Sequence, residues 1–197
     1  MSHAIHHTDG FILKSLNFGE ANKYFFIFTK EFGLIKASAQ GVRHLKSKLR
    51  YSLEDYSFGT VSLVRGKEFW RITGGEKKTD LKKLLPDNPE KFVLVSRVFS
   101  LLLRLLHGEE RNDQLFQQLT EGLKFLYDNK LDASMLSNFE CLLALRILSS
   151  LGYIGNLADF DEFIASPYFT PELLSKMASL RTQAILEINK SLKETQL

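Results

Sequence analysis

Alternating apolar and polar positions occupy most of the first 76 residues in short runs that turns separate. The pattern predicts five strands, at 11–16, 23–30, 34–40, 58–64 and 68–73. A turn at 31–33 closes a hairpin, and Gly74-Gly75 is expected to end the fifth strand. Five strands with a longer connection after the third predict a small closed barrel such as the OB-fold, and an open SH3-like barrel would give almost the same pattern.

From residue 79 the apolar positions recur with the period of a helix. Asn88-Pro89-Glu90 is a helix-start signature ahead of the apolar run 92–106, and Thr170-Pro171-Glu172 repeats it. Further helices are predicted at 113–127, 134–151 and from 170 to about 193, with Gly152 ending the second of these. We therefore expect an α+β chain in which an N-terminal five-stranded OB-fold barrel (1–78) precedes an all-helical domain (79–197).

Composition adds a core and an uneven charge to this picture. The chain is 44% hydrophobic with 16 Phe, enough to bury a sizeable core. Its formal charge of +3 is split unequally, because residues 1–80 carry 13 basic and 8 acidic residues whereas the remaining 117 carry 13 and 15. This asymmetry favours a polyanion-binding N-terminal half.

Cysteine content and hydropathy indicate the cellular compartment that suits such a chain. Cys141 is the single cysteine, so neither an internal disulfide nor a zinc site with several thiolates can form, and a reducing, cytoplasmic setting is expected. The N-terminus MSHAIHHTDGF lacks the apolar stretch of a signal peptide. The run 92–106 contains Arg97 and Arg104 and is too short for a membrane span, so we expect a buried helix and no membrane partner.

No catalytic motif is evident. Gly74-Gly75 lacks the residues that make a phosphate loop, and Cys141 lies in the apolar stretch ECLLALRIL, where packing is the simpler role. The acidic cluster at 159–162 lacks the spacing of a calcium loop. His3, His6 and His7 could converge on a metal, but a flexible terminus is the simpler interpretation. We expect no enzyme activity, no metal and no cofactor.

The residues 36–50, which we call the cationic segment, hold five Lys or Arg and no Asp or Glu. A solvated surface loop tolerates such a run of cations. Charge alone therefore does not decide whether the segment is an ordinary loop or binds a polyanion. The predicted hairpin of the fourth and fifth strands adds cations beside Phe69 and Trp70, of which Trp70 is expected to be buried. The candidate contacts to a phosphate backbone, such as that of DNA, are Lys36, Arg43, Lys46, Lys48, Arg50, Arg65, Lys67 and Arg71.

The segment FTKEFGLIKASAQGVRHLKSKLRYSLEDYS at 28–57 resembles the recombination mediator protein O (RecO) family of bacterial DNA repair. TDGFILK at 8–14 and GEANK at 19–23 are similar to the start of that family. The residues FE, LR and LGY between 139 and 153 are similar to its helical segment. The resemblance follows the whole chain in order, and 28–57 is its specific part.

The resemblance implies a protein that binds single- and double-stranded DNA and anneals complementary strands. It also implies work with the ring-forming recombination protein R, recognition of the acidic, apolar-ended C-terminal tail of single-stranded-DNA-binding protein (SSB), and help in loading recombinase onto coated single strands, without a cofactor. The setting would be the bacterial cytoplasm, at the nucleoid. Carried over by position, Arg43, Lys46, Lys48 and Arg50 would contact the DNA backbone, with Lys36 beside them.

One departure from the family pattern concerns 156–168. Many relatives insert a four-cysteine zinc module there, whereas NLADFDEFIASPY contains no Cys and is acidic. Apolar packing must hold this region instead, and the acidity argues against DNA contact. The candidates for this packing are Leu157, Phe160, Phe163, Ile164 and Phe169.

Two rival functions stay open. A protein-interaction adaptor would use an OB-like barrel without nucleic acid and would dock an acidic, apolar-ended peptide near Arg97, Arg104 or Arg146. A nuclease would need clustered carboxylates for metal, and the sequence offers only scattered ones.

Overall fold

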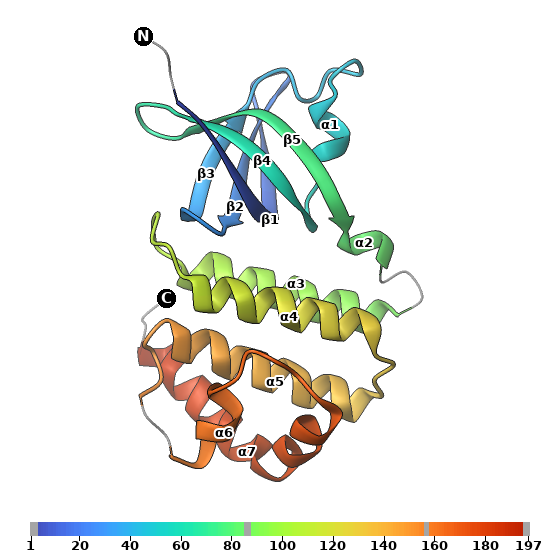
Figure 1. The fold of residues 1–197 in the computed structure, drawn as a ribbon, viewed down its shortest axis with the longest axis vertical. Coiled ribbons are helices and arrows are strands. Elements are labelled where there is room, and N and C mark those ends of the chain that lie inside the picture. Colours follow the sequence, from blue (N-terminus) through green and yellow to red (C-terminus); the bar gives the residue numbers. More distant parts are fainter. Residues whose placement is uncertain (1–3, 85–87, 156–157, 195–197) are drawn as a thin grey trace. The chain divides into compact units, whose positions relative to one another are not determined.

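The computed structural model describes residues 4–84, 88–155 and 158–194. Five strands form a closed barrel in the order β1-β2-β3-β5-β4 (Figure 1). Neighbouring strands are antiparallel except β3 and β5, which pair in parallel. This order is that of the OB-fold and excludes the SH3-like alternative. The strands are β1 (Ile5–Phe18), β2 (Asn22–Thr29), β3 (Gly33–Ala39), β4 (Ser57–Arg65) and β5 (Trp70–Asp80).

Strand alternation sorts the side chains between the barrel interior and its outer surface. On β2, Phe25 and Ile27 are fully buried, whereas the alternate residues Tyr24 and Phe26 are only partly buried. Trp70 is 4% exposed, which confirms its expected burial. The barrel core comprises Ile12, Phe25, Ile27, Ile35, Ala37, Ala39, Val42, Leu53, Val61, Leu63, Trp70 and Ile72.

The prediction that Gly74-Gly75 ends the fifth strand is wrong. β5 runs on to Asp80, and these glycines pair with Ser62 and Val61 of β4. The register shifts next to Ser62, and a Cβ at Gly74 would lie 3.2 Å from the Ser62 hydroxyl oxygen. Here glycine allows two strands to approach closely at a β-bulge, and it does not mark a turn.

The prediction of a flexible terminus is wrong for two of its histidines. β1 begins at Ile5, so His6 and His7 pair with Leu63 and Ser62 of β4. His7 Nδ1 lies 2.9 Å from the Ser62 hydroxyl, and the His6 ring packs edge-on against Phe32 and Trp70. His3 lies outside the described residues, within which no group of three His, Cys, Asp or Glu side chains gathers.

Two helix starts and one helix end in the second half lie where the sequence predicts them. The Lys91 N–H donates to Asn88 Oδ1, and the Leu173 N–H donates to the Thr170 hydroxyl. Gly152 has φ 75° and directly follows Leu151, the C-cap residue of the helix Ala133–Ser150, as predicted. The elements are α3 (Pro89–Leu105), α4 (Asp113–Asp128), α5 (Ala133–Ser150), the 3-10 turn η1 (Ala158–Phe160), α6 (Asp161–Ile164) and α7 (Pro171–Glu194).

Contacts divide the chain into two units. The first comprises residues 1–92 and 99–111, and the second comprises 93–98 and 112–197, so that α3 contributes to both. Two short helices, α1 (Leu49–Ser52) and α2 (Leu81–Leu84), belong to the first unit and were not predicted. The division of domains at residues 78 and 79 stays a prediction.

Within the second unit, α5 packs against α4 and α7 and is buried along most of its length (Figure 1). Phe160, Phe163 and Phe169 are buried, as the packing hypothesis for the cysteine-free region requires, and Ile164 is partly buried. Leu157 lies outside the described residues. Within the described ranges, no helix is both long enough and apolar enough to cross a membrane.

Candidate nucleic-acid interface

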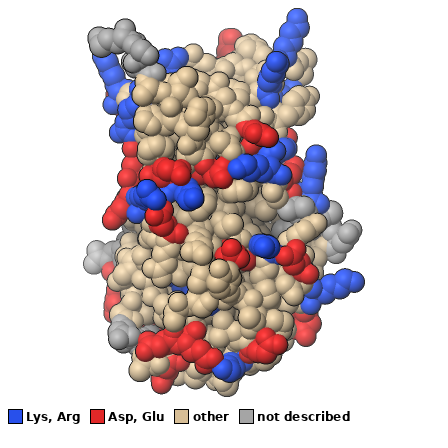
Figure 2. Space-filling view, viewed as in Figure 1, with Lys and Arg blue, Asp and Glu red and all other residues tan. Residues whose placement is uncertain are grey.

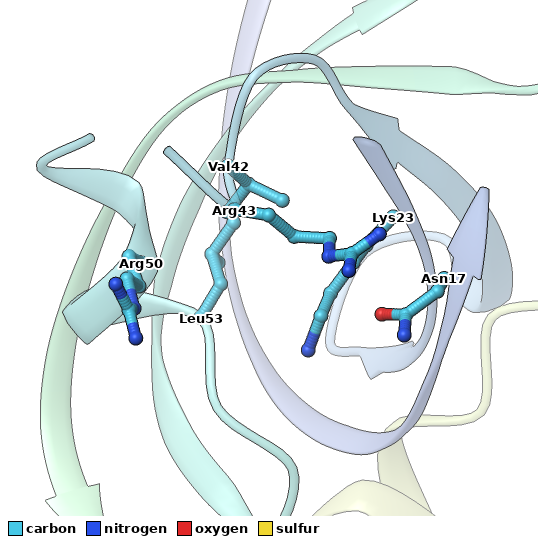
Figure 3. A pocket seen from close by; sticks show the side chains of 6 residues that line it. All are labelled: Asn17, Lys23, Val42, Arg43, Arg50 and Leu53. Atoms are coloured by element: carbon cyan, nitrogen blue, oxygen red, sulfur yellow. The ribbon is translucent and has the colours of Figure 1, made fainter. Parts of the chain in front are cut away.

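The cationic segment folds against the β1–β2 hairpin and leaves a pocket of about 380 Å³, the cationic pocket (Figure 3). In Figure 3, Arg43 points toward Lys23 and Asn17 of the hairpin, and Arg50 of α1 lies on the other side. The lining residues are Asn17, Lys23, Val42, Arg43, Arg50 and Leu53.

Backbone hydrogen bonds hold the cationic segment on the hairpin. Gly41 donates its N–H to Asn22 Oδ1 at 2.9 Å. Its φ of 64° is in the left-handed region, which glycine adopts without steric cost. The Arg43 N–H then donates to the Ala21 carbonyl at 2.9 Å, and Arg43 Nη1 donates to the Gly19 carbonyl at 3.3 Å. The loop position of Arg43 is therefore fixed by the turn that joins β1 and β2.

The floor of the cationic pocket is apolar, and its walls are positively charged. Val42 and Leu53 are 2% and 3% exposed and anchor the floor in the barrel core. Lys23 Nζ donates to the Ser15 hydroxyl at 3.3 Å, which holds the ammonium near the rim.

Among the described lining residues there is no carboxylate to balance Lys23, Arg43 and Arg50. Three unbalanced cations in one hollow favour an anion, and two planar guanidinium groups suit the oxygens of a phosphate.

The predicted site residues are only partly brought together. Arg43 and Arg50 line the cationic pocket, whereas Lys46 and Lys48 are exposed on the loop between them. Lys36 lies elsewhere, on the outer surface of β3, where its Nζ is 4.5 Å from the centre of the Tyr24 ring.

The three cations of the β4–β5 hairpin differ in the contacts that their side chains make. Arg65 forms an ion pair with Glu109 of the first unit and lies over the Trp70 ring, so that much of its charge is already balanced. Lys67 is exposed, and Arg71 Nη2 donates to the Gln40 side chain at 3.5 Å. All three remain candidate DNA contacts.

Asn17 and Lys23 are pocket residues that sequence reasoning missed. They face each other across the β1–β2 pairing, outside the cationic segment. The signal was present, because the second predicted strand begins at Lys23 and the turn at 31–33 joins it to the third strand. Pairing those two strands places Lys23 opposite Ala39, within the cationic segment.

The acidic cluster of the second unit is chemically different. Asp159, Asp161 and Glu162 are exposed, Glu162 pairs with Lys176, and Asp159 accepts a hydrogen bond from Gln183. Figure 2 shows acidic side chains gathered over the part of this unit that lies lowest in that view. A surface of this charge repels phosphate.

Comparison with known proteins gives matches along most of the chain. The family model described as recombination protein O N terminal matches residues 1–79, and the one described as recombination protein O C terminal matches residues 86–159.

Two curated relatives illustrate the likeness. DNA repair protein RecO of Clostridium novyi (strain NT) is 30% identical over 151 residues, which are 76% of this chain and 57% of the relative. DNA repair protein RecO of Clostridium perfringens (strain 13 / Type A) is 28% identical over 161 residues, which are 82% of this chain and 63% of the relative. The chain thus spans less than two thirds of the length of either relative.

Proposed function

The chain belongs to the recombination protein O family, and from this premise we propose that it acts in DNA repair and recombination as a DNA-binding mediator. The observation that carries the proposal is the cationic pocket, in which three cations stand without a carboxylate among the described lining residues. Phosphates of single- or double-stranded DNA are the anions that such a site accepts, because the contact is with the backbone and not with the base.

Strand annealing follows from the same chemistry. Two complementary strands repel each other through their phosphates, and cations held on a protein surface lower that repulsion while leaving bases free to pair. The proposed contacts of the cationic segment are Arg43, Lys46, Lys48 and Arg50, joined by Lys23 from the hairpin. The proposed action is stoichiometric and non-enzymatic.

The proposed partners are those that membership implies. They are single- and double-stranded DNA, recombination protein R and the C-terminal tail of SSB, and the proposed outcome is recombinase loading onto coated single strands. The proposed location is the bacterial cytoplasm, at the nucleoid.

The test replaces Arg43, Lys46, Lys48 and Arg50 together by Gln and measures DNA affinity across a salt series. Each lost phosphate contact flattens the plot of log affinity against log salt by about 0.7–0.9, so the slope should fall by several units. A matched variant changes Lys124, Lys130, Lys190 and Lys193 of the second unit to Gln, with the same loss of charge. Equal annealing by the first variant and the wild type contradicts the site.

A second candidate function is an adaptor that binds an acidic, apolar-ended peptide. A hollow of about 550 Å³ within the first unit favours it, since its lining combines two cations, Lys14 and Arg104, and one carboxylate, Asp55, with apolar side chains such as Leu103. Arg146, the third residue considered for such docking, is 0% exposed, and that part of the hypothesis is wrong. Binding of a tail peptide by a wild-type protein without salt-sensitive DNA binding would favour the adaptor.

A further inference from the structure

The outer surface of the β1–β2 hairpin carries apolar and aromatic side chains that the proposed phosphate contacts leave unused. Leu16 and Phe18 are 45% and 51% exposed, although both are large and apolar. Tyr24 and Phe26 of β2 and Phe69 of the β4–β5 hairpin are partly buried beside them. We call these five residues the aromatic face.

Strand register and ring contacts show that the aromatic face is continuous. Leu16 pairs with Tyr24 across the hairpin, and the rings of Phe18 and Tyr24 lie 4.8 Å apart between centroids. The ring of Phe69 meets Tyr24 edge-on at 5.3 Å. The β1–β2 and β4–β5 hairpins therefore contribute to one surface of the barrel.

Cations border the aromatic face. Phe26 pairs with Lys14 on one side and with Lys36 on the other, and Lys36 Nζ lies 4.5 Å from the Tyr24 ring centre and 5.3 Å from that of Phe69. Exposed Arg71 is on the neighbouring strand, paired in register with Ser38.

Two exposed acids, Glu20 and Glu68, adjoin the aromatic face in the hairpin turns. The three bordering cations, Lys14, Lys36 and Arg71, outnumber these two acids.

Strand alternation along the β1–β2 hairpin places the polar residues of the cationic pocket and the aromatic residues on opposite surfaces. Asn17 and Lys23 turn into the cationic pocket, and their sequence neighbours Phe18 and Tyr24 lie on the opposite surface of the same strands. Phosphate contacts and aromatic rings thus occupy the two sides of one hairpin.

We propose that the aromatic face stacks unpaired bases of single-stranded DNA and so makes the protein prefer single strands, an inference that rests on the proposed function. Every base has a π-surface, so exposed rings bordered by cations bind a single strand without regard to sequence. In a duplex those surfaces are stacked on one another and cannot reach the rings. The cationic pocket serves both forms of DNA, and the aromatic face adds affinity for one of them.

The test compares the affinities of wild type and the double variant Phe18→Ala, Tyr24→Ala for an oligonucleotide and its duplex at one salt concentration. Single-strand affinity should fall about 10- to 100-fold, as loss of base stacking does in other proteins, while duplex affinity and the salt slope stay near wild type. Phe18→Tyr with Tyr24→Phe is the matched control, because it keeps both rings and should keep the preference. Circular dichroism and Trp70 fluorescence verify the fold of each variant.

A measurement on the wild type keeps the test independent of the variants. A single strand containing 5-iodouracil should cross-link under ultraviolet light to peptides that contain Phe18 or Tyr24. Unchanged single-strand affinity in the double variant, equal losses for single strand and duplex, or cross-links confined to other surfaces would each overturn the inference. A wild-type protein that binds neither DNA form would instead overturn the proposed function.

Discussion

Arg146 is a buried cation that acts in structure and not in DNA binding. It is 0% exposed, its Nε donates to the Phe163 carbonyl at 2.7 Å, and its Nη2 donates to the Tyr168 carbonyl at 3.0 Å. Its guanidinium lies 4.2 Å from the centre of the Phe169 ring. Burial lowers the pKa of Arg146 to about 10, so the group stays charged at neutral pH. Carbonyl oxygens and a ring hold this charge and tie the segment 163–169 to α5.

Arg146→Lys should therefore destabilise the protein although it keeps the charge. A single ammonium cannot reproduce the planar fork that reaches both carbonyls, and an unsatisfied buried carbonyl costs about 1–3 kcal/mol. Urea unfolding measures the loss. Arg97→Lys is the control, because Arg97 has a side chain 66% exposed in its pair with Glu140 and should change stability by less than about 0.5 kcal/mol. Equal stability of Arg146→Lys and wild type would contradict the assigned role.

Cys141 gives a second expectation for a single residue. It is 6% exposed, and burial, partly offset by Arg181, raises the pKa of its thiol to about 11 from an ordinary 9.0. Since only the thiolate reacts, the native protein should react with a disulfide reagent at pH 8 at least about 100-fold more slowly than the urea-unfolded protein. Equal rates would show that the thiol is accessible and reactive in the native fold.

Among the elements, the loop between β3 and α1 is held on the β1–β2 hairpin in part by one side chain. Asn22 Oδ1 accepts the Gly41 N–H at the start of this loop. Asn22→Ala should weaken DNA binding without any change in charge, because the loop that carries Arg43 loses one of its hydrogen bonds to the hairpin, and should cost about 1 kcal/mol of stability. Fluorescence anisotropy with labelled DNA measures the affinity. An unchanged affinity would mean that loop order does not matter for binding.

The fold was predictable where a single sequence rule, such as strand alternation or helix capping, determines the local structure. The alternating pattern predicted the strand at 23–30, which carries the buried Phe25 and Ile27, and capping placed the starts of α3 and α7 at Asn88 and Thr170. Prediction failed at Gly74-Gly75, because glycine is used both for turns and for close strand pairs, and only the partner strand decides between them. It failed at His6 for the same reason, since β4 supplies the pairing that extends β1.

The site was predictable only as far as its residues lie together in sequence. Arg43 and Arg50 belong to one charged run, whereas Asn17 and Lys23 reach the cationic pocket through cross-strand pairing. Phe18 and Tyr24 are similar, because a count of aromatic residues does not show which of them face outward. Where charge and ring positions depend on the register of a hairpin, composition cannot supply them.

At the scale of the whole molecule, acid-sensitive ion pairs gather in the first unit. Burial alone would raise the pKa of Asp80, but hydrogen bonds and charge from Lys77 outweigh it and hold the pKa below its ordinary 3.8. Asp9 behaves likewise through Lys78 and Thr60. A carboxyl with a lowered folded pKa adds stability that is full above the unfolded value and is lost as the pH falls through the folded one.

Two probes can follow this loss separately, because Trp70 is the single tryptophan and is buried in the barrel. Between about pH 5 and pH 3, the urea midpoint reported by Trp70 fluorescence should fall more than the midpoint reported by helical circular dichroism. Both carboxylates contribute to that difference, and Asp9 contributes less because solvent screens its more exposed side chain. Asp80→Asn keeps an acceptor for the Lys82 N–H but cannot titrate, so this variant should show a smaller acid shift. Coincident midpoints at every pH would show that the barrel and the helices unfold as one, and an unchanged acid shift in Asp80→Asn would show that this carboxylate does not set the acid limit.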